Sequence, residues 1–308
     1  MRVLLVCSFK ENLAENAAPF IVEQRKALQR LGVECEMFLV KGKGIRGYLR
    51  QLHPLKDRIK EFHPDVIHAH YGLCGLLANL QRKAPVVTTY HGSDINEKRA
   101  RRFSKIAMRL SAWNVFVSKM TMNIARLGKN VTLLPCGVDL TELQLTSKQE
   151  ARRLMHLELE KKYVLFAGAF DNTVKNAPLA LKAAELSGVE LLELKGYTRD
   201  EVTLLMCAAD ALLMTSLNEG SPQVIKEAMA CGCPIVSVNV GDVKERVDGV
   251  EGCFVAQNRE PQELSNMLGM ALAFQGRTQG RKKIIEDGLE NDLVAKELMG
   301  IYEYLKSF

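Results

Sequence analysis

The stretch Glu219-Gly220-Ser221-Pro222-Gln223-Val224-Ile225-Lys226-Glu227 decides the fold class of this 308-residue chain. It follows an apolar run, Ala211–Met214, of the kind that forms a buried parallel strand. Pro222 suits the first turn of a helix, because the N–H that proline lacks is not needed there, and Ser221 can cap the exposed N–H groups. The stretch therefore predicts a strand that passes directly into a helix.

The residues that follow complete a βαβ unit. We expect the helix to end near Ala230, with Gly232 just past its end, and the apolar run Pro234–Val238 to form the next strand. In open α/β sheets ligands bind at the carboxyl ends of the strands, which is where this helix begins. Because a helix N-terminus favours anions, the sequence predicts a phosphate site here.

Two carboxylates flank the predicted phosphate site. Glu219 precedes the helix, and Glu227 lies about one and a half turns into it. A carboxylate repels phosphate, so its useful partners beside such a site are hydroxyl groups, which sugars supply. The plainer alternative is that Glu219 caps the helix and Glu227 is a solvated helix residue. The combination of loop, helix start and paired carboxylates favours a site for a sugar phosphate.

This region resembles a known signature. Glu219, seven further residues and Glu227, followed by 228–236, are similar to the donor site of retaining glycosyltransferases of the GT-B fold, above all family 4. The resemblance implies two Rossmann-like, doubly wound parallel-sheet domains that face each other across a cleft. It divides the chain into an acceptor-side domain (1–142), a trimmed donor domain (143–290) and a helix that crosses back to the first domain (291–308).

The rest of the chain alternates between strand and helix patterns, which is typical of doubly wound sheets. In the first half we expect strands at 2–7, 33–40, 65–70, 85–90, 113–117 and 131–134, and helices at 19–31, 49–62, 73–82 and 98–110. In the second half we expect strands at 162–168, 189–194 and 252–255, and helices at 175–187, 198–208, 260–274 and 291–306. Loops are predicted at 41–47 and 169–174, and a polar linker at 141–162.

The expected strand ends of the first half gather polar residues. His91, in the run His-Gly-Ser-Asp, matches a pattern of the resembled family, which implies contact with the donor sugar or the reacting centre. The alternative is a turn residue at a strand end. His68 and His70 alternate on one strand and so share a face; with no acidic partner nearby, we favour no metal there. Loop 8–18 lacks the glycines usual in the family, and Asn12, Asn16 and Ala17 stand in it instead.

The second half supplies the predicted phosphate contacts. In the resembled family a basic residue after a glycine and a lysine further on clamp the donor pyrophosphate. Lys175 matches the lysine, whereas Ala169 stands where the other cation is usual. We therefore expect Lys175 and the N–H groups of Gly220 and Ser221 to bind the diphosphate. Cys136 likewise stands where the family usually has Asn.

Composition limits the other classes of function. The chain is 47% hydrophobic and 25% charged, with a net charge of +6 and eight scattered cysteines. This is an ordinary globular composition with reduced thiols, and it shows no basic-aromatic interleaving typical of RNA binding. No apolar run is long enough to span a bilayer, and residues 1–7 are too short for a signal peptide, so we expect a cytoplasmic protein. The basic helix at 98–110 is predicted to be a solvated surface helix, with a dock for anionic lipid or for an acidic acceptor as the alternative.

The predicted function is transfer of a sugar from a nucleotide-sugar to a hydroxyl of a saccharide or lipid-linked acceptor, in cell-surface polysaccharide or glycolipid synthesis. Retention of the anomeric configuration is implied by the resemblance. Glu219 is expected to orient sugar hydroxyls and Glu227 to hold the ribose. The sequence has no Asp-x-Asp motif, so no metal or other cofactor is expected. The alternatives are a sugar-nucleotide epimerase of GT-B shape and a sugar-nucleotide-binding subunit without catalysis.

Overall fold

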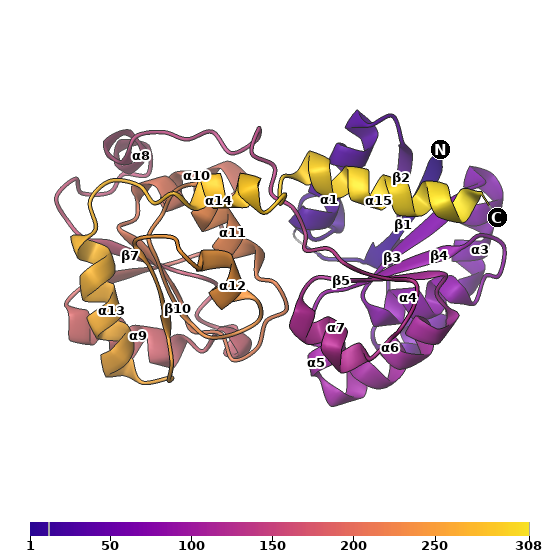
Figure 1. The fold of residues 1–308 in the computed structure, drawn as a ribbon, viewed down its shortest axis with the longest axis horizontal. Coiled ribbons are helices and arrows are strands. Elements are labelled where there is room, and N and C mark those ends of the chain that lie inside the picture. The colour runs from indigo at the N-terminus through magenta and orange to yellow at the C-terminus, as the bar shows by residue number, and fades with distance from the viewer. Residues whose placement is uncertain (12, 308) are drawn as a thin grey trace. The chain divides into compact units, whose positions relative to one another are not determined.

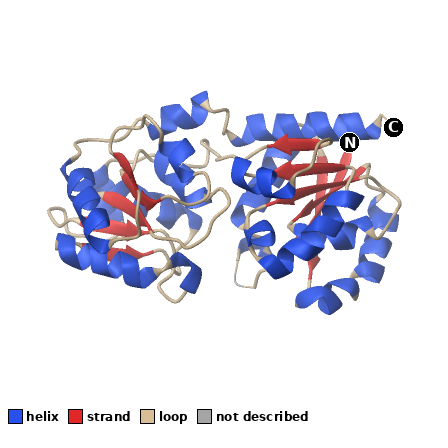
Figure 2. Ribbon diagram, turned by 60° about the horizontal axis from the view of Figure 1, so that its bottom comes forward, coloured by secondary structure: helices blue, strands red, loops and turns tan. Residues whose placement is uncertain are grey.

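The computed structural model describes residues 1–11 and 13–307 and divides into two compact units. Unit 1 comprises Met1–Gly137 and Leu289–Phe308, and unit 2 comprises Val138–Gly288. The predicted divisions after residues 142 and 290 compare with observed divisions after Gly137 and Gly288. Each unit is a parallel sheet with helices on both faces (Figures 1 and 2).

Unit 1 contains a six-stranded sheet in which every pairing is parallel, with the strand order β2-β1-β3-β4-β5-β6. The strands are β1 (Arg2–Ser8), β2 (Glu34–Val40), β3 (Val66–His70), β4 (Val86–Tyr90), β5 (Trp113–Phe116) and β6 (Val131–Leu133). Its helices are η1 (Ala14–Asn16), α1 (Pro19–Arg30), α2 (Gly44–Leu49), α3 (Leu52–Phe62), α4 (Gly72–Asn79), α5 (Ser93–Asn96), α6 (Lys98–Leu110), α7 (Lys119–Ala125) and α15 (Asn291–Lys306).

The alternation of β1 explains why helices cover both faces of this sheet. Val3 and Leu5 point to one face, where they pack with residues of α1 and α15. Leu4 and Val6 point to the other face, towards α3 and α4. Because a strand buried on both sides must be apolar at every position, β1 reads as a continuous apolar run. Figure 1 shows α15 lying beside α1, although the two helices are far apart in the sequence.

Unit 2 contains a five-stranded parallel sheet with the order β11-β10-β9-β7-β8. The strands are β7 (Tyr163–Phe166), β8 (Glu190–Glu193), β9 (Ala211–Met214), β10 (Ile235–Val238) and β11 (Cys253–Ala256). Its helices are α8 (Lys148–Leu154), η2 (Thr173–Lys175), α9 (Ala177–Ser187), α10 (Arg199–Ala208), α11 (Gln223–Ala230), α12 (Val243–Val247), α13 (Pro261–Ala273) and α14 (Gly280–Glu286). Both sheets confirm the predicted doubly wound parallel architecture.

Three local predictions were wrong. The predicted linker 141–162 contains α8, whose start is capped by Ser147 accepting from the N–H of Glu150. The predicted loop 41–47 runs into α2 at Gly44. The helix predicted from Lys175 is interrupted at Asn176, which adopts a left-handed conformation (φ 54°) and separates η2 from α9.

The strand orders locate the positions at which ligands are expected. In each sheet the order reverses once, between β1 and β3 in unit 1 and between β7 and β9 in unit 2. The chain leaves two neighbouring strands in opposite directions at such a point and so opens a crevice beyond their carboxyl ends. The segments that follow β7 and β9 carry Lys175 and Glu219, and β3 ends at His70.

Candidate functional site

Lys175 and Glu219 meet at the switch point of unit 2. The Lys175 Nζ lies 2.7 Å from Glu219 Oε1, and the two side chains are 21% and 18% exposed. Gly168, just beyond β7, allows this approach, because a Cβ there would lie 2.6 Å from Lys175 Cγ. Thr215 also fixes the lysine segment by donating its hydroxyl to the carbonyl oxygens of Lys175 and Asn176. Two residues predicted for the site are therefore in direct contact, 44 positions apart in the sequence.

The loop before α11 is fixed by other hydrogen bonds than the predicted helix cap. Pro222 is the N-cap residue and no side chain caps the helix, so Ser221 is not the cap. The Ser221 hydroxyl instead donates to Asp242 Oδ2 at 2.8 Å, and Arg246 Nε donates to the same oxygen at 3.0 Å. In the described part of the chain, neither Gly220 nor Ser221 donates its backbone N–H to a protein acceptor. Two N–H groups at this loop therefore suit an anionic ligand.

Asp242 itself is buried between this loop and α12. Burial raises the pKa of its carboxyl, and the charges of Lys226 and Arg246 oppose that rise. Its Oδ1 has no hydrogen-bond partner among the described residues. Arg246 continues the network to Asp287 at 3.2 Å. The carboxylate thus links the loop that carries Ser221 to α12, and through Arg246 to the chain just after α14.

Glu227 is buried, which excludes the plainer alternative of a solvated helix residue. Its Oε1 lies 2.7 Å from Nη1 of Arg199, the first residue of α10, and its side chain is 7% exposed. No local pattern pointed to Arg199, because Arg199 and Glu227 lie on different helices, α10 and α11, and meet only in the folded chain. Each carboxylate of the predicted pair therefore faces its own cation.

The histidines of unit 1 lie together at the carboxyl ends of β3 and β4. His70 is fully buried and stacks on His68 with 4.6 Å between ring centroids, so the predicted shared face is confirmed. His91 is half-buried and its Nε2 lies 3.0 Å from His70 Nδ1. Among the residues described, no group of three or more His, Cys, Asp or Glu side chains is arranged to hold a metal ion. Of loop 8–18, Asn12 lies outside the described residues.

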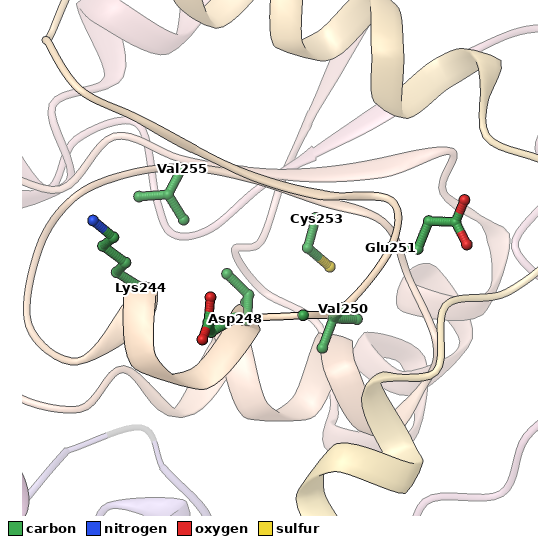
Figure 3. Close-up of a pocket in the computed structure, with 8 residues that line it drawn as sticks. Lys244, Asp248, Val250, Glu251, Cys253 and Val255 are labelled. Atoms are coloured by element: carbon green, nitrogen blue, oxygen red, sulfur yellow. The ribbon is translucent and has the colours of Figure 1, made fainter.

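One surface pocket lies elsewhere in unit 2. A pocket of about 440 Å³ adjoins the edge strand β11 and is lined by residues that include Lys244, Asp248, Glu251 and Cys253 (Figure 3). None of the residues predicted for the site lines it. Burial raises the pKa of the Cys253 thiol to about 12, so this thiol is not a nucleophile at neutral pH. We assign the pocket no function.

No helix within residues 1–11 and 13–307 is long and apolar enough to span a bilayer.

Two stretches of the chain match families of known proteins. Residues 2–142 match the family described as Glycosyltransferase Family 4, and residues 160–273 match the family described as Glycosyl transferases group 1. A putative teichuronic acid biosynthesis glycosyltransferase, TuaC of Bacillus subtilis, is 26% identical over 223 residues, which cover 62% of this chain and 57% of that protein. The chain thus spans less than two thirds of that relative.

Solved structures share the fold at low sequence identity. Sucrose-phosphate synthase from Thermosynechococcus elongatus superposes with a TM-score of 0.81 at 16% identity, covering 99% of both chains. HepE from Anabaena, solved in complex with UDP-glucose, gives a TM-score of 0.72 at 18% identity over 100% of both chains. These likenesses show that the architecture of two Rossmann-like units is common to all three chains.

Proposed function

Because the chain belongs to the family 4 glycosyltransferases, we propose that it transfers a sugar from a nucleotide-sugar donor to an acceptor hydroxyl. The observation that carries this proposal is the Lys175–Glu219 pair at the switch point of unit 2. Beside it lie the N–H groups of Gly220 and Ser221, which donate to no acceptor among the described residues. A cation and two amide dipoles suit a diphosphate leaving group, and a carboxylate suits sugar hydroxyls. The similar HepE was solved with UDP-glucose, which supports the class of donor.

Each residue then has a role in the proposed reaction. Lys175 and the N–H groups of Gly220 and Ser221 stabilise the departing nucleoside diphosphate, with Pro222 setting the loop that presents them. Glu219 orients hydroxyls of the donor sugar, and Glu227 holds the ribose. His91 contacts the donor sugar at the reacting centre, and the anomeric configuration is retained. The roles of His91 and the retention rest on the family resemblance.

We propose that the leaving group is stabilised without a divalent cation. The sequence has no Asp-x-Asp motif, and Lys175 already supplies positive charge where the diphosphate would lie. Turnover in excess EDTA should equal turnover in Mg²⁺ after the protein has been stripped of metal. A strict requirement for added metal would contradict this.

The acceptor is proposed to be a saccharide or lipid-linked saccharide of the cell surface. The similar TuaC carries a name from teichuronic acid biosynthesis, which favours a polymer of this kind. On α6 the exposed side chains form a cationic surface with two apolar members: Lys98, Arg99, Arg102, Lys105, Arg109, Ile106 and Leu110. Within the described residues none of its five cations pairs with a carboxylate, so this surface suits a peripheral contact with anionic lipid.

Vesicle binding tests the membrane contact separately from catalysis. The protein should sediment with vesicles of phosphatidylcholine and phosphatidylglycerol and not with pure phosphatidylcholine. The double substitution R102E/K105E should abolish that binding, whereas K43E/K129E, which changes the net charge equally at exposed positions of unit 1, should not. Equal loss in both variants would mean that only the net charge matters.

Calorimetric titration with UDP, GDP and ADP, followed by the matching nucleotide-sugars, tests the donor. One nucleoside diphosphate should bind clearly more tightly than the others, and its sugar should be transferred to an oligosaccharide of a cell-surface acceptor panel. Binding without transfer or hydrolysis would favour the non-catalytic subunit. That alternative is supported by Ala169, which replaces the usual cation, and by loop 8–18, which lacks the usual glycines. Rearrangement of the donor without an acceptor would favour the epimerase. No binding of any nucleotide would overturn all three.

A further inference from the structure

Three histidines form a continuous stack at one edge of unit 1. The ring centroids of His68 and His70 lie 4.6 Å apart, and those of His70 and His91 lie 5.3 Å apart. Only His91 is partly exposed, since His68 and His70 are fully buried. The proposed function uses His91 alone, which leaves two buried imidazoles without an assigned purpose.

The hydrogen bonds of His68 account for both of its ring nitrogens. Nδ1 lies 2.5 Å from the Tyr302 hydroxyl, and Nε2 lies 2.7 Å from Thr89 Oγ1. Tyr302 belongs to α15, so this histidine ties the last helix to the sheet. A side chain with both nitrogens satisfied is held in one orientation. His68 is therefore a fixed platform on which His70 stacks.

His70 has a different pattern. Its Nδ1 lies 3.0 Å from His91 Nε2, but its own Nε2 is buried and has no hydrogen-bond partner among the described residues. Burial lowers the pKa of His70 to about 3, so the ring is neutral and carries one proton. Buried N–H groups without a partner are rarer than buried acceptors without one, because an unsatisfied donor is costly. The proton therefore belongs on Nδ1, which makes His70 the donor to His91.

We propose that His70 is a positioning residue that fixes His91 as the tautomer protonated at Nδ1. Because Nε2 of His91 accepts from His70, the proton of a neutral His91 lies on the opposite nitrogen. That nitrogen lies 3.8 Å from Cys136 Sγ, and sulfur is a weak acceptor that a ligand oxygen can replace. The rings of Phe20 and Tyr71, at 4.9 and 4.5 Å from that of His91, keep its plane.

The consequence for the proposed function, on which this inference rests, is that His91 meets its ligand as a hydrogen-bond donor and not as a base. A neutral imidazole that presents N–H can hold a sugar oxygen without removing a proton from it. The buried histidine behind it, which stays neutral, prevents the tautomer from switching. His70 thus acts through His91 and does not itself touch the substrate.

Nitrogen-15 NMR of the full chain labelled at histidine reads the tautomer without any ligand. The chain has six histidines, and the spectrum of H91Q identifies the signals of His91. At pH 7.5 we expect Nδ1 of His91 to be protonated and Nε2 to be unprotonated, and Nδ1 of His70 to be protonated. A protonated Nε2 on His91 would overturn the proposal.

Two variants separate positioning from packing. H70N keeps an N–H donor near the position of Nδ1, whereas H70L removes it. We expect H70L to yield a mixture of His91 tautomers and H70N to keep the wild-type one.

With a nucleotide-sugar substrate, H70L should lower kcat by about 10- to 100-fold with little change in KM for the donor, and H70N should restore most of it. Equal tautomer ratios in both variants would contradict the proposal. If H70L does not fold, wild type and H70N still decide the tautomer. Because the NMR needs no substrate, a failed transfer assay would count against the proposed function alone.

Discussion

Lys175 Nζ and Glu219 Oε1 lie 2.7 Å apart, so the cation proposed to bind the diphosphate already holds a carboxylate in the protein without ligand. Both side chains are about four-fifths buried. A diphosphate that approaches Lys175 must compete with Glu219 for the ammonium group. Removing Lys175 should therefore weaken nucleotide binding, whereas removing the charge of Glu219 should leave it unchanged or strengthen it. These are the first two predictions.

Replacing Lys175 should weaken the binding of the nucleoside diphosphate. K175A removes the cation that faces Glu219 at the switch point, and a charge-assisted hydrogen bond of this kind is worth about 1.5–3 kcal/mol, or roughly 10- to 100-fold in Kd. Calorimetric titration with the preferred nucleoside diphosphate measures the change. K182A is the matched control, because Lys182 is an exposed lysine of the adjoining α9 that pairs with Glu185. Equal affinity in K175A and wild type would remove Lys175 from the diphosphate site.

Replacing Glu219 should separate binding from turnover. E219Q abolishes the negative charge beside the phosphate, so the nucleoside diphosphate should bind as tightly as in wild type or several-fold more tightly. Turnover should be lost, because an amide orients sugar hydroxyls poorly. The melting temperature should change little, since a partly exposed ion pair contributes on the order of 1 kcal/mol or less. A large drop in melting temperature would instead give Glu219 a structural role.

Acid should destabilise unit 1 through His70. The folded state holds the pKa of His70 at about 3, while the unfolded chain protonates near 6.5. Between these values the unfolded state binds more protons, so stability falls as pH falls from about 6.5. The loss from this residue between pH 7 and pH 5 is about 2 kcal/mol.

Urea unfolding of wild type and H70N at pH 7 and pH 5 measures that loss. Asparagine does not titrate, so H70N should lose about 2 kcal/mol less than wild type over this interval. His68 and Asp94 also have shifted pKa values from burial, lowered and raised respectively, but both residues are present in both proteins. An identical pH dependence in the two proteins would mean that His70 is accessible to protons in the native state.

Features indicated by neighbouring residues could be predicted from the sequence, whereas contacts between residues far apart in the chain could not. The strands and the helix after Glu219 were predictable, because apolar runs and a proline at a helix start are signals carried by neighbouring residues. The partners of Ser221 and Glu227 were not. Asp242, at the start of α12, contacts Ser221, and Arg199, at the start of α10, contacts Glu227. Nothing in the local sequence pattern distinguishes these two residues from ordinary surface charges. Helix α8 was missed for a different reason: its helix-start signal, Ser147 with Glu150 three residues on, is local but lies in a charged segment that was read as a linker.

The pairing of Gly241 with the loop before α11 offers a test of how that loop is held in place. Gly241 adopts φ +61°, and a Cβ there would lie 2.7 Å from the carbonyl oxygen of Gly220 and 3.3 Å from Glu219 Cβ. A side chain at Gly241 would therefore displace the loop that supplies the proposed phosphate contacts. Gly249 has a similar φ of +71° but nothing within 4 Å of a Cβ, so it is a control with the same backbone strain and no clash.

G241A and G249A should consequently differ in their affinity for nucleotide, although the backbone strain in the two variants is similar. Each should lose about 1 kcal/mol because alanine is disfavoured at positive φ. Only G241A should also weaken binding of the nucleoside diphosphate, by roughly tenfold or more, since the N–H groups of Gly220 and Ser221 are moved from their positions. Urea unfolding and calorimetric titration measure the two effects separately. If G241A binds nucleotide as well as G249A does, the loop before α11 tolerates displacement, and its amides do not contribute to holding the diphosphate.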